Sequence, residues 1–148
     1  MSAFSGVAEK SGIASGVAAK TLLQILAAAN HRLRIKEVGV CFHGIVNTEA
    51  PVLVQLVRQS TAGTMSALTP VKEDSSLAET LTTTAQHTAT AEPTNTDVLR
   101  SWAVHPQSGL VYQAVPGDEP IVPGAGRVGL VVTAGVSINV DAYIKFEE

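Results

Sequence analysis

The chain has 148 residues, a net charge of −3 and charged side chains at only 16% of its positions. One domain of this length can bury a core unaided, and its acidic balance argues against nucleic-acid binding, which needs clustered Lys and Arg. The single cysteine, Cys41, excludes an internal disulfide and a cysteine-based zinc site. No apolar stretch reaches the roughly 20 residues of a membrane helix, and residues 1–20 lack the basic start and apolar run of a signal peptide.

Hydrophobic residues make up 45% of the chain and aromatic residues only 4%, which predicts a core built mainly from Val, Leu, Ile and Ala. Globular chains normally keep about a quarter of their residues charged. The low charge here has two interpretations that stay open, a surface partly covered by other subunits or simply a lightly charged sandwich.

Residues 1–19 are predicted to be an extended N-terminal arm, separate from a folded body at 20–148. The segment is rich in Ser, Ala and Gly, and each glycine lowers helix propensity by about 1 kcal/mol relative to Ala. Its isolated hydrophobic residues are the expected anchors on a partner: Phe4, Val7, Ile13 and Val17. The alternative is a terminus without a fixed structure.

The body begins with a predicted strand at 21–27 and a turn at 28–31. In the next run, 32–42, the apolar residues change phase between Ile35 and Val38. A one-residue bulge near 36–37 would let both groups face the core, since bulges occur where strands bend.

Further strands are predicted at 52–59, 82–91, 97–104 and 110–114. The first of these is nearly continuous in apolar residues, which is typical of an interior strand. A long polar connection at 60–79 has weak strand character around 67–71, and a Pro- and Gly-rich corner spans 115–126.

Residues 127–146 contain the last two strands, and the second of them alternates strictly between apolar and polar side chains. Because side chains on a strand point alternately to opposite faces, this predicts a half-buried antiparallel strand built into the sheet. The chain therefore has eight or nine predicted strands and no helix. The predicted fold class is all-β, an antiparallel two-sheet sandwich, with the long connections favouring a jelly roll.

The sequence motifs that could indicate ligand binding or catalysis have structural explanations. Residues 124–129 match G-x-G-x-x-G, but a β-branched run follows where a dinucleotide fold needs a helix. The four histidines are too far apart in sequence for a local metal pair, so no metal or cofactor is predicted, although a calcium site among the loop carboxylates stays open. Cys41 is expected to be a small buried hydrophobe.

Two smaller groups of residues are assigned in the same way. The basic cluster Arg32, Arg34 and Lys36 is expected to form a solvated strand face. Trp102 is expected to belong to the core and not to a ligand platform, with Tyr112 beside it.

The layout from AKTLLQILAAANHRLRIKEVGVCFHG through TDVLRSWAVHP to EPIVPGAGRVGLVVTA and DAYIKFEE resembles the capsid cement, or decoration, proteins of tailed bacteriophages. The resemblance covers nearly the whole chain in pattern and contains no short diagnostic motif. It implies a jelly-roll body with an N-terminal arm, assembled as a homotrimer on the outer capsid surface. The implied partner is the major capsid protein, and the implied location is the virion, after assembly in the host cytoplasm.

These observations lead to a structural virion protein as the first functional hypothesis, without enzymatic activity, nucleic acid or membrane as partner. The alternative is a carbohydrate- or receptor-binding sandwich, as in a tail fibre or lectin. Its site would lie in loops 60–79 and 105–120, with Trp102 or Tyr112 stacking on a sugar. A third hypothesis, an enzyme on a cupin-like barrel, requires a bound transition metal.

Overall fold

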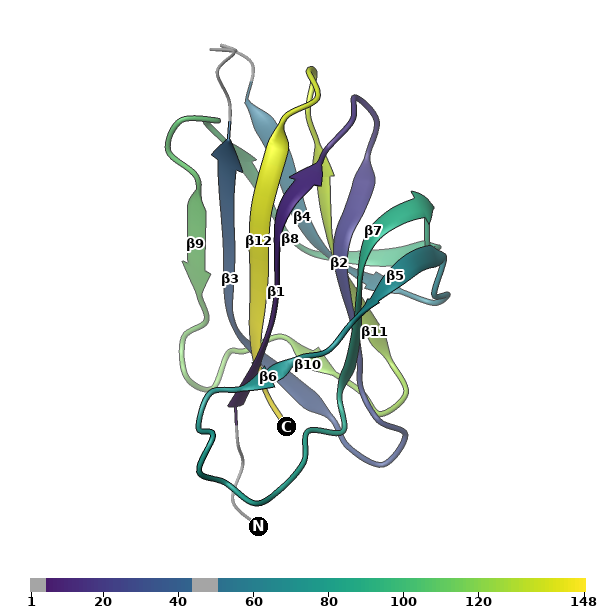
Figure 1. Ribbon diagram of the computed structural model, residues 1–148, viewed down its shortest axis with the longest axis vertical. Helices are drawn as coiled ribbons and strands as arrows, with labels where there is room; N and C mark the ends of the chain where they lie inside the picture. The colour runs from purple at the N-terminus through teal and green to yellow at the C-terminus, as the bar shows by residue number, and fades with distance from the viewer. Residues whose placement is uncertain (1–4, 44–50) are drawn as a thin grey trace.

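The computed structural model describes residues 5–43 and 51–148, and these residues form a sandwich of two antiparallel β-sheets (Figure 1). Sheet A has the order β10 (Ile121–Val122), β3 (Leu33–His43), β12 (Asn139–Glu147), β1 (Ser5–Ala14) and β6 (Val71–Lys72), and β9 (Leu110–Gln113) also pairs with β3. Sheet B has the order β5 (Thr64–Leu68), β7 (Thr84–Ala91), β2 (Lys20–Leu26), β11 (Arg127–Thr133), β4 (Val52–Gln59) and β8 (Asn95–Val104). The predicted all-β two-sheet sandwich is confirmed, and the jelly-roll topology stays a prediction.

Hydrogen-bonded neighbours in both sheets come from distant parts of the chain. No strand pairing in the described residues joins two strands that are consecutive in sequence. Most connections instead cross from one sheet to the other, as from β1 to β2 and from β11 to β12. The core between the sheets is therefore assembled from contacts that close long loops, and such contacts form slowly in folding.

Strand β12 supplies one complete wall of the core, as its alternating sequence predicts. Its inward side chains Val140, Ala142, Ile144 and Phe146 are at most 1% exposed. Opposite them stand the apolar residues of β2, β4 and β11, so the core is aliphatic with Phe146 as its largest fully buried side chain. Burying a Val, Leu, Ile or Phe side chain contributes about 1.5–3 kcal/mol, which makes this layer the main source of stability.

The predicted bulge in β3 is confirmed. Ile35 pairs with Phe146 and Glu37 pairs with Lys145, which leaves Lys36 as the extra residue. The apolar residues on both sides of it consequently face the core: Leu33, Ile35, Val38 and Val40 are fully buried, and Phe42 packs against them while partly buried.

The expectation for Cys41 was wrong, because its side chain is exposed. Val40 and Phe42 face the core, so the period of two in a strand turns Cys41 to the outer face of sheet A. The apolar neighbours in sequence indicated burial, but the alternation set by the bulge decides the side.

The separate N-terminal arm is also corrected for residues 5–14. This segment forms β1, an interior strand of sheet A that pairs with β12 over most of its length and with β6 at Gly6 and Val7. Its small residues fit here because Gly6 lies against the Phe146 ring and Ala8 is fully buried. Deleting residues 1–19 would therefore remove a strand of the body and leave the edge of β12 unpaired.

The structure contains more strands than predicted, twelve in the described residues. The polar connection 60–79 contributes two short strands, β5 and β6, and the corner 115–126 contributes β10. These strands lie at sheet edges and have two to five residues, so their sequences need no apolar alternation. Strand β4 is interior, between β11 and β8, as its apolar run predicts.

Candidate functional site

The outer face of sheet A is rich in ionisable side chains that are paired with one another. The outward positions of β3 and β12 carry Arg34, Glu37, Cys41, His43, Asp141, Tyr143, Lys145 and Glu147. Directly opposite residues of an antiparallel pair lie on the same face. This set, together with the bulge residue Lys36 and its partner Glu119, is called the sheet-A face below.

Tyr143 lies at the centre of the sheet-A face. Its ring passes from β12 over Gly39 of β3 and occupies the space that a Cβ at this position would need. Its hydroxyl donates to Glu37 Oε2 at 2.6 Å, and Gln113 Nε2 donates to Glu37 Oε1 at 2.7 Å. These hydrogen bonds lower the pKa of Glu37, while burial and the bond to Glu37 raise the pKa of Tyr143 to about 12.

Ion pairs continue the sheet-A face towards the bulge. Lys36 Nζ lies 2.8 Å from Glu119 Oε1 and 3.7 Å from Glu147 Oε2. The hydrogen bond from Lys36 lowers the pKa of Glu119 to about 2, and the same bond raises the pKa of Lys36. The basic cluster predicted as a solvated face thus has one member, Lys36, in a carboxylate pair.

At the other end of this face, Asp141 joins three strands. Its Oδ1 accepts a hydrogen bond from Gly12 N of β1 at 2.8 Å, and its Oδ2 contacts His43 Nε2 of β3. The bond from Gly12, followed by that of His43, lowers the pKa of Asp141. Cys41 pairs with Asp141 across the ladder. Even so, no three His, Cys, Asp or Glu side chains in residues 5–43 and 51–148 are arranged as metal ligands.

The outer face of sheet B is almost without charge. Its paired outward positions on β7, β2, β11, β4 and β8 carry Thr84, Gln86, Thr21, Gln24, Leu26, Arg127, Gly129, Val131, Thr133, Leu53, Gln55, Val57, Gln59, Asn95, Val98, Ser101 and Ala103. Arg127 is the one ionisable side chain among them. This set is called the sheet-B face below.

Amide side chains form a chain of hydrogen bonds across the sheet-B face. Gln86 Nε2 donates to Gln24 Oε1 at 3.2 Å, and Gln24 Nε2 donates to Gln59 Oε1 at 2.8 Å. Gln59 Nε2 in turn donates to Thr21 Oγ1 at 3.0 Å and to Asn95 Oδ1 at 2.8 Å. Gln24 and Gln59 are at most 5% exposed. These hydrogen bonds therefore give their buried amides the partners that water would provide at the surface.

Two connections cover the middle of the sheet-B face. The carbonyl of Thr61, after β4, accepts from Gln24 Nε2 at 3.0 Å. The Glu92 carboxylate, after β7, accepts from Thr21 N at 2.8 and 3.0 Å. Strand β7 pairs with β2 only as far as His87, and Thr88 then has a positive φ of 58°. This change of direction separates the end of β7 from β2.

Trp102 and Tyr112 lie where β8 of one sheet meets β9 of the other. Their ring centroids are 5.2 Å apart at 46°, and the Arg100 guanidinium lies 5.8 Å from the centroid of Tyr112. Both rings are partly buried and pack against the core, so Trp102 contacts the core without lying inside it, and Tyr112 lies beside it as expected. Each ring already has a partner within the chain, which weakens the idea of sugar stacking here.

Two connections meet at one end of the sandwich (Figure 1). They are residues 15–19 between β1 and β2 and residues 134–138 between β11 and β12. Together they are called the loop end below. Ser15 N donates to Ile138 O at 2.9 Å, and Ile138 N donates to Ser15 Oγ at 3.1 Å. Gly16 N donates to Ser137 Oγ at 3.2 Å. Val17 and Val136 project outward and are 68% and 42% exposed.

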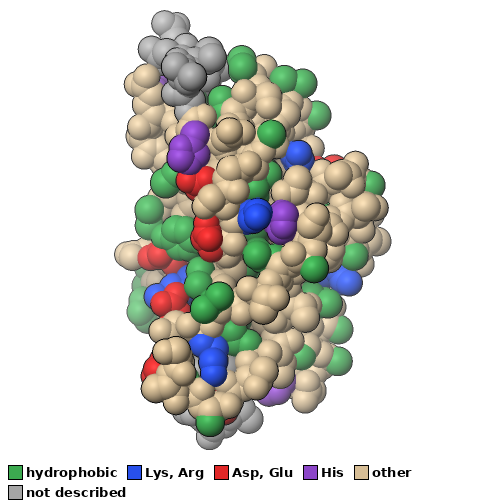
Figure 2. All heavy atoms as spheres, in the orientation of Figure 1, with side chains coloured by type: hydrophobic (Ala, Val, Ile, Leu, Met, Phe, Trp, Pro, Cys, Tyr) green, Lys and Arg blue, Asp and Glu red, His purple; other side chains and the backbone are tan. Residues whose placement is uncertain are grey.

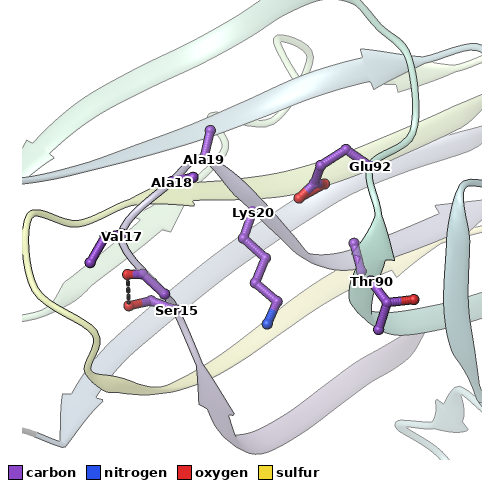
Figure 3. A pocket seen from close by; sticks show the side chains of 9 residues that line it. Ser15, Val17, Ala18, Ala19, Lys20, Thr90 and Glu92 are labelled. Carbon is purple, nitrogen blue, oxygen red and sulfur yellow. Dashed lines mark hydrogen bonds between the residues drawn. The ribbon is translucent and has the colours of Figure 1, made fainter.

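At this end of the molecule green side chains are scattered among tan atoms, and the blue and red side chains lie farther down (Figure 2). Beside the loop end is an open hollow of about 470 Å³, lined by residues 15–20 with Ala89, Thr90 and Glu92 (Figure 3). Its two charged side chains are engaged within the chain. Lys20 Nζ donates to Ala14 O at 3.0 Å, and Glu92 accepts from Thr21 N.

The predicted arm anchors have different places in the structure. Phe4 lies outside the described residues. Ile13 is 3% exposed within the chain's own core, and Val7 is partly buried on the outer side of β1. Of the three anchors that the structure describes, Val17 is the one that is freely accessible, at the loop end.

Sequence reasoning missed Val136 and the amides Gln24 and Gln59. No signal in the sequence singles out Val136, because its Gly-Val pair between small residues also occurs at Gly6-Val7, inside strand β1. The signal for the amides was a glutamine inside each of the apolar runs TLLQIL and VLVQLVRQ.

Comparisons with known proteins give no relative for this chain. No protein-family model matches it, and no curated protein or solved structure matches it either. Among the described residues there is also no helix with the length and apolar character needed to cross a membrane.

Proposed function

We propose that the protein is a structural component of a tailed-bacteriophage virion, a decoration protein that binds the outer surface of the head and bridges coat subunits. The observation that carries this proposal is the outward side of β4 and β8 on the sheet-B face, where Leu53, Val98, Ser101 and Ala103 are exposed and uncharged. Interface cores are depleted in charged residues relative to the remaining surface. A face of this composition favours contact with protein over contact with bulk water.

The partner proposed for the sheet-B face is another copy of the chain, in a homotrimer. Val98 of the edge strand β8 is 55% exposed and Leu53 of β4 is 38% exposed. Val57, paired with Val98, is already buried, so a neighbouring copy would extend an existing apolar layer. The bulges in β8 make continued strand pairing unfavourable, which favours packing through side chains.

The assembly is tested by native mass spectrometry of the full chain at micromolar concentration. We expect a trimer, and we expect Val98→Glu to convert it to monomer, because a carboxylate would be buried without a partner. Val111→Glu is the matched control, since Val111 is 62% exposed on β9 of the other sheet. A stable monomer, or equal effects of the two variants, would contradict the trimer.

Attachment is tested by co-sedimentation with expanded heads that were assembled from coat protein of the same phage without this chain. The expected result is saturable binding and higher thermal stability of the heads, because a ligand that binds only the assembled shell stabilises it. Absence of binding would refute the decoration function. A glycan array tests the carbohydrate alternative, and a reproducible sugar signal would favour that alternative instead.

A further inference from the structure

We infer that the loop end is the surface that docks on the shell, with Val17 and Val136 inserting together into an uncharged apolar depression on a coat subunit. The inference rests on the proposed function and adds which part of the molecule makes the contact. It also assigns the sheet-B face and the loop end to different partners, other copies and the coat respectively.

The two loops form one preformed unit. Three hydrogen bonds, at 2.9, 3.1 and 3.2 Å, join residues 15 and 16 to residues 137 and 138. Ser15, Ala134 and Ile138 are at most 6% exposed and fasten the unit to the core. The valines therefore project from a backbone held by its own contacts, so little conformational entropy is lost when they bind.

Both valines are accessible to a partner. They are 68% and 42% exposed, and the backbone beside them is built from small residues, Gly16, Ala18, Ala19 and Gly135. A Cβ added at Gly16 or Gly135 would meet nothing within 4 Å. A partner surface can therefore approach both side chains closely.

The absence of charge in the two loops indicates the chemistry of the partner. Residues 14–19 and 133–138 contain no charged side chain. Lys20 and Glu92 line the hollow, and they are hydrogen-bonded to the chain's own Ala14 O and Thr21 N. A charged group placed over the two valines would lose hydration without meeting an opposite charge in these two loops. The surface thus fits an apolar, uncharged protein depression, with the hollow of about 470 Å³ receiving a side chain from its rim.

A lipid surface fits less well. Membrane-binding loops combine apolar residues with Lys or Arg and with Trp or Phe at the interface. The two loops have neither kind of residue, and the chain has a net charge of −3. The coat subunit is therefore the favoured occupant, while lipid and a second copy become outcomes of the test.

The test compares two double variants of the full chain in the head co-sedimentation assay. Val17→Ser with Val136→Ser is expected to weaken binding about 30-fold, which corresponds to about 2 kcal/mol. The control is Val111→Ser with Val115→Ser, whose valines are 62% and 68% exposed at the β9 side of sheet A. The control is expected to bind within about twofold of the unmodified chain. Circular dichroism and native mass spectrometry confirm that both variants fold and form the same oligomer.

The outcomes separate this inference from the proposed function. If the unmodified chain fails to bind heads, the proposed function is refuted and the inference with it. If it binds and the Val17/Val136 variant binds equally well, the inference is overturned while the function stands. Loss of the trimer in that variant would assign the loop end to a second copy, and binding to neutral phosphatidylcholine vesicles would assign it to lipid; either result overturns the inference.

Discussion

The outer faces of the two sheets differ although both sheets have six strands and share one core. The sheet-A face pairs ionisable groups with one another, as in Lys36 with Glu119 and Tyr143 with Glu37. On the sheet-B face amide side chains are hydrogen-bonded to one another, as Gln24 is to Gln59, and these two side chains are at most 5% exposed. Charges on sheet A can remain in contact with water, whereas amides on sheet B are covered by connections of the same chain.

This difference shows how the same fold can produce two kinds of surface. Burying a charge costs more than burying an amide, and an amide needs only hydrogen-bond partners to be accommodated. A face that is to be covered by protein is therefore better built from Gln, Asn and Thr. The following predictions compare the two faces, beginning with the largest expected effect.

Gly129→Ala on the sheet-B face is expected to destabilise the fold by about 3 kcal/mol. A Cβ at this position would overlap the Gln59 amide, which is buried between Gln24, Thr21 and Asn95 and has no alternative partners at hand. Urea unfolding followed by tryptophan fluorescence measures the loss. A change below about 1 kcal/mol would show that the amide chain can rearrange.

Gly39→Ala on the sheet-A face is the matched substitution and is expected to cost about 1 kcal/mol. The Cβ would overlap the Tyr143 ring, but this ring lies on an outer face and can turn towards solvent. The same urea experiment provides the comparison. Equal losses for the two glycine variants would contradict the idea that only the sheet-B face is tightly covered.

Acid is expected to weaken the sheet-A face selectively. The folded-state pKa of Glu119 is lowered from 4.5 to about 2, so its contribution to stability is present above pH 4.5 and is lost as the pH falls towards 2. The pKa values of Glu37 and Asp141 are lowered too, which gives the same sign. Glu119→Gln should make the unfolding free energy less dependent on pH across this window. An unchanged slope would remove Glu119 from the explanation.

The Tyr143 hydroxyl provides a local measure of the sheet-A face. Ultraviolet titration should show one tyrosine ionising at about 12, against 10.0 for an unperturbed side chain. Glu37→Gln should lower this pKa, because a neutral amide no longer opposes the tyrosinate charge. The pKa should stay above 10.0, because burial is the larger cause of the shift. A tyrosine insensitive to Glu37 would contradict the observed hydrogen bond.

Substitution of Cys41 is expected to have the smallest effect on the free energy of unfolding. Since its side chain is exposed on the sheet-A face, a thiol reagent should label it fully in the native protein without denaturant. Cys41→Ser should change the free energy of unfolding by no more than about 0.5 kcal/mol. Slow labelling that tracks global unfolding would restore the expectation of a buried thiol.

The sequence by itself determined the features that depend on local alternation. The period of two in β12 predicts which of its side chains form the core, and the change of phase across Lys36 predicts the bulge in β3. Both follow from strand geometry, which is the same wherever the strand lies in the fold.

Tertiary structure alone decided what covers each element. The small residues of β1 indicated a free arm, but in the structure they pair with β12. The hydrogen bond from Gly12 N to Asp141 Oδ1, for example, joins residues that are 129 positions apart in the sequence. The loop end likewise joins residues 15 and 138, which no local pattern relates. Pairings across such distances depend on the chain closing long loops around a common core, and that information is spread over the whole sequence.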